Sequence, residues 1–467
     1  MTRLIHLSND VLFIYYLASN VLYLAFLVTA WLAGVRHRQR LTSLRLERLE
    51  SSPLTPPVTV LVPAHNEEAT IVESVRALLG MDYPSLELIV INDGSRDRTL
   101  ALLKETFRLR LTNLLYVTQI PSAPVRGLYT SDADNRLLVV DKISAGNKAD
   151  AVNAGLNAAT SPYVCVIDAD SILEKDALVR IMAGVFSDTD SVGASGGIVR
   201  VLNGSRVTAG AVTEPRLPSR PVEVLQVVEY LRAFLVGRQA WAALDMLPII
   251  SGAFGVFRRD LVMQVGGFRR EAIGEDIDLI VRIHRWAQES RQRLGVRFLA
   301  EPTCWTQVPA TLRSLKGQRQ RWHKGLLDVL WKNRDMLFSS RHGRFGWLML
   351  PYLLIFELLA PFIEVAGYTT MLLAAVTGVL STAFFLQFVM FGYAFATLIS
   401  IGSVVQEEVN HRRYNRPRDV ALLLAYCFLE HFPYRQLNMF WRVQAVWQYC
   451  RGDLAWGALE RKAVASH

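Results

Sequence analysis

Hydrophobic and polar positions divide this chain into segments of different character. Residues 11–34 and 345–405 are almost free of charge, whereas the stretch between them has an ordinary density of charged residues. Apolar runs of such length can cross a hydrocarbon core of roughly 30 Å. We therefore expect four parts, namely an N-terminal transmembrane helix (1–40), a cytosolic domain (55–340), transmembrane or interfacial helices (341–450) and a cytosolic tail (451–467).

Basic residues next to the apolar runs predict how the chain is oriented. Arg36, Arg38 and Arg40 follow the first run, so the positive-inside rule places residue 36 onward in the cytoplasm. A cleaved signal peptide is disfavoured, because the run is long and no positive region of the usual kind precedes it. Residues 345–405 are long enough for two spans, and the basic loop 411–418 then returns to the cytoplasm.

Charged residues also occur within the C-terminal apolar part. Glu357 and Glu364 are seven positions apart and share one face of a continuous helix, where they serve either a polar channel or structural ion pairs. Residues 420–447 mix charged and aromatic side chains, which suits an interfacial or re-entrant helix better than a simple span.

The middle of the chain alternates between strand and helix patterns. Buried strands are expected at residues 58–63, 86–91, 137–141 and 163–167, and a helix at 69–79 follows the first of them. Such alternation predicts a doubly wound α/β sheet, whose ligands bind at the carboxyl ends of the strands. The polar, Pro/Ser-rich stretches 122–136 and 203–221 are expected to be loops, inserted at the surface and without chemistry of their own.

Acidic residues follow two of the predicted strands. Asp168 and Asp170 come directly after an apolar strand, where two carboxylates can share a hard cation that in turn holds a diphosphate. Asp93 ends another strand, so that either contact with a nucleobase or ribose or a simple turn-forming role fits it.

Two helix starts carry further charged side chains. Lys148 and Asp150 open one helix, where Asp150 suits the positive end of the dipole and Lys148 has no capping role, which favours a ligand contact. Glu275 and Asp276 open another helix. They are either an ordinary acidic first turn or the general base that removes a proton from an attacking sugar hydroxyl.

A later basic helix places three side chains on one face. Gln318, Arg321 and Trp322 have the spacing of neighbours on a helix surface. An arginine can hold a departing diphosphate with two hydrogen bonds, and a tryptophan offers a flat apolar surface to a sugar ring. The alternative is a basic amphipathic helix that lies at the membrane surface.

Composition narrows the classes of function. The formal net charge of +9 is spread along the chain without interleaved basic and aromatic positions, so nucleic-acid binding is not expected. The four cysteines are far apart and form no CxxC pair, which argues against a zinc site and against a disulfide framework.

Seven motifs occur together in a characteristic order. They are residues 62–68 (VPAHNEE), 93–95 (DGS), 148–150 (KAD), 168–170 (DAD), 251–254 (SGAF), 275–276 (ED) and the Gln318, Arg321 and Trp322 set. In this order and between apolar helices, the motifs resemble the processive family 2 glycosyltransferases, the synthases of cellulose, hyaluronan and poly-N-acetylglucosamine. The poly-N-acetylglucosamine branch is most similar, because Gly255 and residues 257–259 (FRR) follow the fifth motif and the late helical part is small.

This resemblance implies a GT-A fold (a Rossmann-like nucleotide-sugar domain), an inverting mechanism, a UDP-sugar donor, a growing polysaccharide acceptor and Mg²⁺ or Mn²⁺. It also implies a multi-pass protein of a bacterial-type inner membrane. The implied catalytic residues are Asp276 as the base and Glu275 beside it, and the implied metal ligands are Asp168 and Asp170. The implied substrate-binding residues are Pro63, Asn66, Glu67, Asp93, Lys148, Asp150, Asp168, Ser251, Gly252, Ala253, Phe254, Gln318, Arg321 and Trp322.

The chain departs from the family pattern in two respects. Gly274 precedes the acidic pair where the family often has threonine, and no second long helical array or cyclic-dinucleotide domain is visible. The small helical part suggests an export or regulatory membrane subunit as a partner. Two other functions stay open, a transferase that adds one sugar to a polyprenyl-type lipid carrier and a non-enzymatic receptor or scaffold with a decayed transferase domain. The expected donor is a UDP-N-acetylhexosamine.

Overall fold

The computed structural model describes residues 2–43, 49, 52, 54–186, 192–208, 210–378, 380–414 and 416–453. The chain forms two compact units. Among the described residues, a helical unit comprises residues 2–34, 217–243 and 309–453, and a sheet unit comprises residues 35–216 and 244–308. Residues 217–243 and 309–340 were expected in the middle domain, but they are helical and pack with the other helices.

The sheet unit is built on one sheet with strand order β3-β4-β5-β2-β1-β6-β11-β8-β12-β7. Its parallel centre contains the four strands that the sequence predicts, β1 (Val58–Ala64), β2 (Leu86–Asp93), β5 (Leu137–Lys142) and β6 (Tyr163–Ile167). These strands are continuous apolar runs because helices cover the sheet, so both strand faces are buried. The helices that follow β1, β2 and β5 are α3 (Ile71–Leu79), α4 (Thr99–Phe107) and α5 (Lys148–Ala158).

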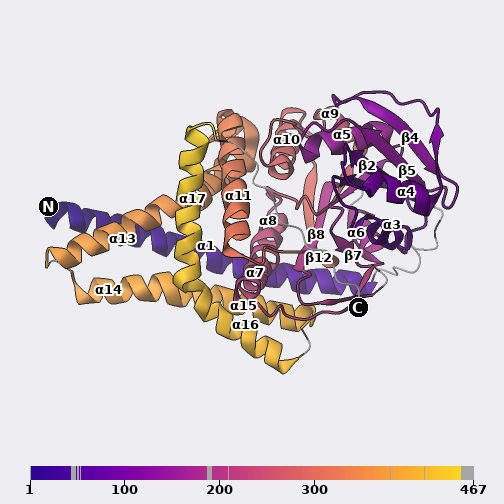
Figure 1. The fold of residues 1–467 in the computed structure, drawn as a ribbon. Coiled ribbons are helices and arrows are strands. Elements are labelled where there is room, and N and C mark those ends of the chain that lie inside the picture. The colour runs from indigo at the N-terminus through magenta and orange to yellow at the C-terminus, as the bar shows by residue number, and fades with distance from the viewer. Residues whose placement is uncertain are drawn as a thin grey trace. The chain divides into compact units, whose positions relative to one another are not determined.

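Further strands extend the sheet on both sides, and their pairings are partly antiparallel and partly parallel (Figure 1). On one side are β3 (Leu109–Thr112) and β4 (Val125–Ser131), and on the other are β11 (Phe254–Arg258), β8 (Val192–Val201), β12 (Gly295–Thr306) and β7 (Ile172–Leu173). The remaining helices of this unit are α6 (Ala177–Phe186), α9 (Arg259–Gln264) and α10 (Glu275–Glu289).

The two polar stretches expected to be irregular insertions contain strands, so that prediction was wrong. Residues 122–136 include β4, and residues 203–221 include the hairpin of β9 (Arg206–Thr208) and β10 (Ala211–Glu214). Their side chains are largely half-buried or exposed, so polar residues are tolerated in these strands and the apolar alternation is weak.

The helical unit contains both long and short helices. They are α1 (Thr2–Ser43), α7 (Pro221–Leu231), α8 (Gln239–Ala243), α11 (Leu312–Lys332), α12 (Leu350–Tyr352), α13 (Ala360–Val376), α14 (Thr382–Val389), α15 (Phe395–Asn410), α16 (Pro417–Leu429) and α17 (Arg435–Cys450). Within the described residues, Leu7–Arg36 and Phe385–Asn410 are long and apolar enough to cross a membrane. The bent pair Phe345–Leu358 and Ala360–Val376, with a 43° angle, would make a third span.

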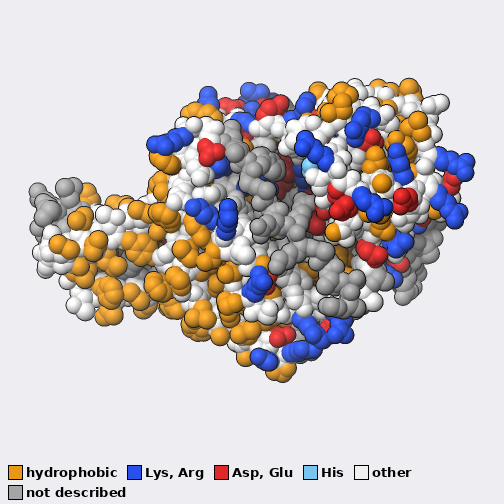
Figure 2. All heavy atoms as spheres, viewed as in Figure 1, with side chains coloured by type: hydrophobic (Ala, Val, Ile, Leu, Met, Phe, Trp, Pro, Cys, Tyr) orange, Lys and Arg blue, Asp and Glu red, His pale blue; other side chains and the backbone are white. Residues whose placement is uncertain are grey.

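Hydrophobic side chains gather on the visible surface of α13 and α14 (Figure 2). Exposed members include Leu372, Val376 and Leu386. A contiguous apolar surface of this kind marks a membrane or protein contact. Together with the long apolar helices, it indicates that the protein is membrane-associated.

Glu357 and Glu364, expected to serve either a polar channel or structural ion pairs, both have arginine partners. Glu364 forms an ion pair with Arg435, and Glu357 forms one with Arg442, both arginines being on α17. The helix bends between the two glutamates, so the seven-residue spacing does not keep them on one regular face. The structural ion pairs are therefore present. Residues 420–447 are also interrupted, because Phe432 has an extended backbone (φ −154°, ψ 127°) between α16 and α17.

Candidate active site

The predicted site residues of the sheet unit lie around the carboxyl edge of the central strands. Asp93 ends β2, and Asp168 directly follows β6. Strand β11 runs antiparallel to β6 with Phe254 opposite Ile167, so the start of β11 adjoins the end of β6. Residues 251–253 and Asp168 are thereby brought to the same edge, which is where open α/β sheets bind their ligands.

Lys148 contacts several of these residues. Its ammonium group forms an ion pair with the Asp168 carboxylate and donates a hydrogen bond of 2.7 Å to the Gly252 carbonyl oxygen. Burial acts to lower the pKa of Lys148, but the charges of Asp168, Glu275 and Asp276 outweigh it and raise the pKa. Lys148 is therefore a cation at the meeting point of three predicted motifs.

Gly252 fills the space between this cation and the predicted base. A Cβ atom at this position would lie 3.3 Å from Lys148 Nζ and 3.9 Å from Asp276 Oδ2. The structure therefore places Lys148, Asp168, Gly252 and Asp276 in one cluster, as their predicted roles in one site require. A larger side chain at position 252 would occupy the region between base and cation.

Asp276 is held by the helix that it opens. Its Oδ1 accepts a hydrogen bond of 2.8 Å from the Ile277 N–H in the first turn of α10. Carboxylates are stabilised at helix N-termini by the unpaired N–H groups and the helix dipole. One oxygen is thus used to fix the carboxylate, while Oδ2 lies toward Gly252.

The neighbouring carboxylates Asp168 and Asp170 fit a divalent cation. Burial, and after it the negative charge of Asp168, raises the pKa of Asp170 to about 6, so a cation would relieve an unfavourable pair. The described residues contain no cluster of three or more histidine, cysteine or acidic side chains that could hold a metal alone. Mg²⁺ is commonly bound by one or two carboxylates together with substrate phosphates, and this donor set matches that mode.

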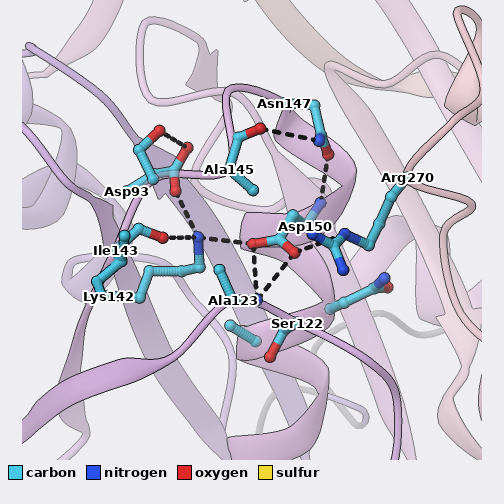
Figure 3. A network of polar contacts seen from close by, with 12 residues as sticks. Asp93, Ser122, Ala123, Lys142, Ile143, Ala145, Asn147, Asp150 and Arg270 are labelled. Atoms are coloured by element: carbon cyan, nitrogen blue, oxygen red, sulfur yellow. Dashed lines mark hydrogen bonds and ion pairs between the residues drawn. The ribbon is translucent and has the colours of Figure 1, made fainter.

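Asp93 is connected to a buried polar network (Figure 3). Its Oδ1 is 2.5 Å from Lys142 Nζ, and its Oδ2 accepts a hydrogen bond of 3.1 Å from the Ser144 hydroxyl. Lys142 also lies 2.7 Å from Asp150 Oδ2, and the side chains of Lys142 and Asp150 are completely buried. This network fixes the carboxylate that the sequence predicts at the nucleoside.

The carboxylate of Asp150 has partners on both oxygens. Besides Lys142, it contacts Arg270 Nε at 2.9 Å and accepts a hydrogen bond of 3.0 Å from the Ala123 N–H. These contacts favour a positioning role over the direct substrate contact predicted for Asp150. Sequence reasoning missed Lys142, although a charged residue at the end of an apolar strand was a usable signal, and it missed Arg270, for which no local signal existed.

The first motif connects two loops at the same edge. Asn66 has a left-handed backbone (φ 56°), donates its N–H to Ser95 Oγ at 3.0 Å, and accepts from the Arg96 N–H at 2.8 Å. Glu67 is buried and donates its N–H to Thr99 Oγ1 at 2.8 Å. Pro63 is part of β1. The contacts show how this loop is shaped, and substrate binding by these three residues stays a prediction.

Gln318, Arg321 and Trp322 lie on α11 of the helical unit and are therefore described apart from the cluster around Lys148. The Trp322 side chain is 45% exposed, and the guanidinium of Arg319 lies 4.4 Å from its ring centroid. Arg319 is itself buried and forms an ion pair of 2.7 Å with Glu229 on α7. Trp322 thus presents a ring whose orientation is supported from within its own unit.

Most of the residues described above lie in segments that match known protein families. Residues 129–325 match the model described as "Glycosyltransferase like family 2", and residues 59–119 match "Glycosyl transferase family 2". The chain carries a family 2 glycosyltransferase domain, a domain of hexosyltransferases. The expected α/β GT-A fold with additional apolar helices is confirmed by the family match and the sheet topology.

Curated relatives point to one branch of the family. The chain is 29% identical over 304 residues to the poly-beta-1,6-N-acetyl-D-glucosamine synthase of Staphylococcus aureus (strain COL), covering 64% of this chain and 60% of the relative. It is 27% identical over 291 residues to the probable glycosyltransferase YdaM of Bacillus subtilis (strain 168), covering 62% and 60%. The chain therefore matches about three fifths of the length of these relatives. These similarities confirm the expected resemblance to poly-N-acetylglucosamine synthases.

Among solved structures, a mannosyltransferase from Pyrobaculum calidifontis, PcManGT in complex with GDP-Man and Mn²⁺, is similar with a TM-score of 0.48 and 20% identity. The match covers 89% of this chain and 99% of that one.

Proposed function

We propose that this protein polymerises a sugar from a UDP-sugar donor into a β-linked exopolysaccharide by an inverting mechanism. The observation that carries the proposal is the cluster in which Lys148 joins Asp168 and Gly252 beside Asp276. The Lys148 cation and the neighbouring carboxylates of Asp168 and Asp170 suit a diphosphate. The Asp276 carboxylate suits a hydroxyl group. Similarity to poly-N-acetylglucosamine synthases supports an N-acetylhexosamine as the transferred sugar.

The reaction is a single displacement. The acceptor hydroxyl oxygen bonds to the anomeric carbon while its proton passes to Asp276, and the bond from that carbon to the diphosphate oxygen breaks. The electron pair of the broken bond leaves with UDP. Attack from the face opposite the leaving group inverts the anomeric centre, so an α-linked donor gives a β-linkage. The hydrogen bond from Ile277 N–H holds Asp276 for this transfer.

Charged side chains of the sheet unit act on the donor. Asp93 would contact the uridine, where Lys142 and Ser144 keep its carboxylate in place. Lys148 would contact the nucleotide while it keeps Asp168 and the Gly252 carbonyl together. A Mg²⁺ or Mn²⁺ ion held by Asp170 with Asp168 would neutralise charge on the diphosphate.

The remaining motifs are assigned to the acceptor and the leaving group. Residues 251–254 and the exposed ring of Trp322 would contact the growing polysaccharide, and Gln318 and Arg321 would contact the diphosphate. Their motif order and the exposure of Trp322 support this assignment.

The helical unit would anchor the enzyme in the bilayer, with the sheet unit in the cytosol, and assist translocation of the product. The long apolar helices and their exposed hydrophobic side chains support the anchoring role. An export or regulatory membrane subunit belongs to the same proposal, for which the small helical part is the motivation.

The test is UDP release by the purified full-length chain in detergent, across a panel of UDP-sugars with Mg²⁺ or Mn²⁺, followed by sizing of the product. We expect release with a UDP-N-acetylhexosamine, a product of many sugars, and loss of activity with EDTA. A product that stops after one sugar on an added polyprenyl phosphate would replace polymerisation with single transfer. Absence of UDP release with every donor would contradict the enzymatic function.

A further inference from the structure

The segment between α9 and α10 is fastened to two helices that carry predicted site residues. We name residues 265–270 the strap. It follows α9 and leads, through a turn in which Ala272 N–H bonds to Arg269 O, to the start of α10. The N–H groups of residues 265–267 bond to carbonyl oxygens of α9, whereas residues 268–270 contact α5 and α10.

Helix α5 holds the strap through two side chains on one helix face. Asn153 accepts a hydrogen bond from Phe268 N–H and donates one to Phe268 O, both at 2.8 Å. Three positions earlier, the buried carboxylate of Asp150 pairs with Arg270 (Figure 3). Residues at i and i+3 are neighbours on a helix surface, so α5 binds the strap at two adjacent points.

Helix α10 holds the same segment from its own side. Arg282 donates a hydrogen bond of 2.6 Å to Gly267 O and pairs with Asp278 at 2.8 Å. The Asp278 carboxylate is fully buried and also pairs with Arg269 at 3.0 Å. The adjacent residues Arg269 and Arg270 therefore bind different helices.

The strap lies very close to α5. Gly267 has φ +71°, and a Cβ atom there would lie 2.7 Å from Asn153 Oδ1. Only glycine allows this approach without displacing Asn153. The strap therefore has little freedom to slide along α5.

The two helices that the strap joins begin with Lys148 and with the Glu275 and Asp276 pair. We propose that the strap sets the position of Asp276 relative to Lys148, and that Arg270 is a positioning residue for glycosyl transfer. This inference rests on the proposed function, in which Asp276 is the base. A displacement of about 1 Å in a reacting group can lower a rate on the order of 100-fold.

The test compares Arg270→Ala and Arg270→Lys with the wild-type chain and with Arg258→Ala. Arg258 is a matched control because it pairs with Asp260 in an outlying ion pair at the other end of β11. Rates are expressed per UDP-binding site, so that a loss of folded protein does not count as a loss of rate. We expect Arg270→Ala to lower kcat about 10- to 100-fold with UDP affinity within about threefold of wild type. Arg270→Lys should recover part of the rate.

Hydrogen–deuterium exchange of residues 275–278 provides a second measurement that does not need activity. Arg270→Ala should speed exchange in this first turn of α10, and Arg258→Ala should not. Unchanged exchange, or a wild-type kcat per site in Arg270→Ala, would overturn the inference, as would a loss of UDP affinity equal to the loss of rate. A wild-type chain without transferase activity would instead refute the proposed function. The exchange rates would then be the test of whether the strap holds the start of α10. If the alanine variant does not fold, Arg270→Lys carries the same comparisons.

Discussion

Lys142 and Lys148 are close in sequence, but their surroundings suit different tasks. Lys142 is completely buried between Asp93 and Asp150, so its ammonium group has protein partners in place of solvent. The Lys148 side chain retains 20% exposure and its partner Asp168 retains 35%. Lys148 is therefore accessible to a nucleotide, whereas Lys142 holds the carboxylate of Asp93, which we propose contacts the uridine.

A buried histidine gives a prediction for pH dependence. Burial lowers the pKa of His284 on α10 to about 4, despite its hydrogen bond to Leu247 O and the charge of Asp245. The unfolded chain then binds more protons than the folded chain between pH about 6.5 and 4, so stability falls as pH is lowered through this window. The shift corresponds to at most about 3 kcal/mol.

Thermal unfolding of the full chain in detergent at pH 7, 6 and 5 measures this effect. The melting temperature of wild type should fall more steeply than that of His284→Gln, because glutamine cannot gain a proton. Parallel pH curves for the two proteins would show that His284 is not the group responsible.

At the scale of elements, the strap between α9 and α10 contains two neighbouring glycines that differ in the space available for a side chain. Gly266 and Gly267 both have positive φ, but a Cβ atom at Gly266 would meet no atom within 4 Å, whereas one at Gly267 would collide with Asn153 and Ile120. Gly266→Ala should cost about 1 kcal/mol for its backbone conformation. Gly267→Ala should cost a further 1–3 kcal/mol, roughly the range for overpacking.

The difference between these variants is measured by thermal unfolding and by the transfer rate per UDP-binding site. Gly267→Ala should melt at a lower temperature and transfer more slowly than Gly266→Ala. Equal melting temperatures and rates would argue against close contact between the strap and α5.

The predictability of each element depended on how strongly burial shaped its sequence. The central strands β1, β2, β5 and β6 are buried on both faces, so continuous apolar runs revealed them. Strand β4 is largely half-exposed, and its polar residues concealed it within an expected loop. Local motifs likewise predicted Lys148, Asp168 and Asp276, which the structure brings together. Arg270 acts through a partner 120 positions away in the chain, and no local pattern contains such a contact.

At the scale of the whole molecule, the chain divides differently from the expected order of domains. Residues 217–243 interrupt the sheet unit in sequence, and residues 312–332 follow its last described residues. Both segments belong to the helical unit, so Trp322 is carried by helices rather than by the sheet. Sequence periodicity predicted the helix of Trp322, but it could not assign that helix to a unit. The paired arginines of α17 likewise explain Glu357 and Glu364, which the apolar pattern alone left ambiguous.

The most direct test of the central claim is UDP release from a UDP-N-acetylhexosamine by the purified full chain beside its Asp276→Asn variant, with UDP binding measured on both. Asparagine preserves the shape of the side chain but cannot accept the proton of the acceptor hydroxyl. Removal of the base predicts a loss of release on the order of 100-fold or more, with UDP affinity retained. Full activity in Asp276→Asn would contradict the account, because the cluster around Lys148 would then lack its base.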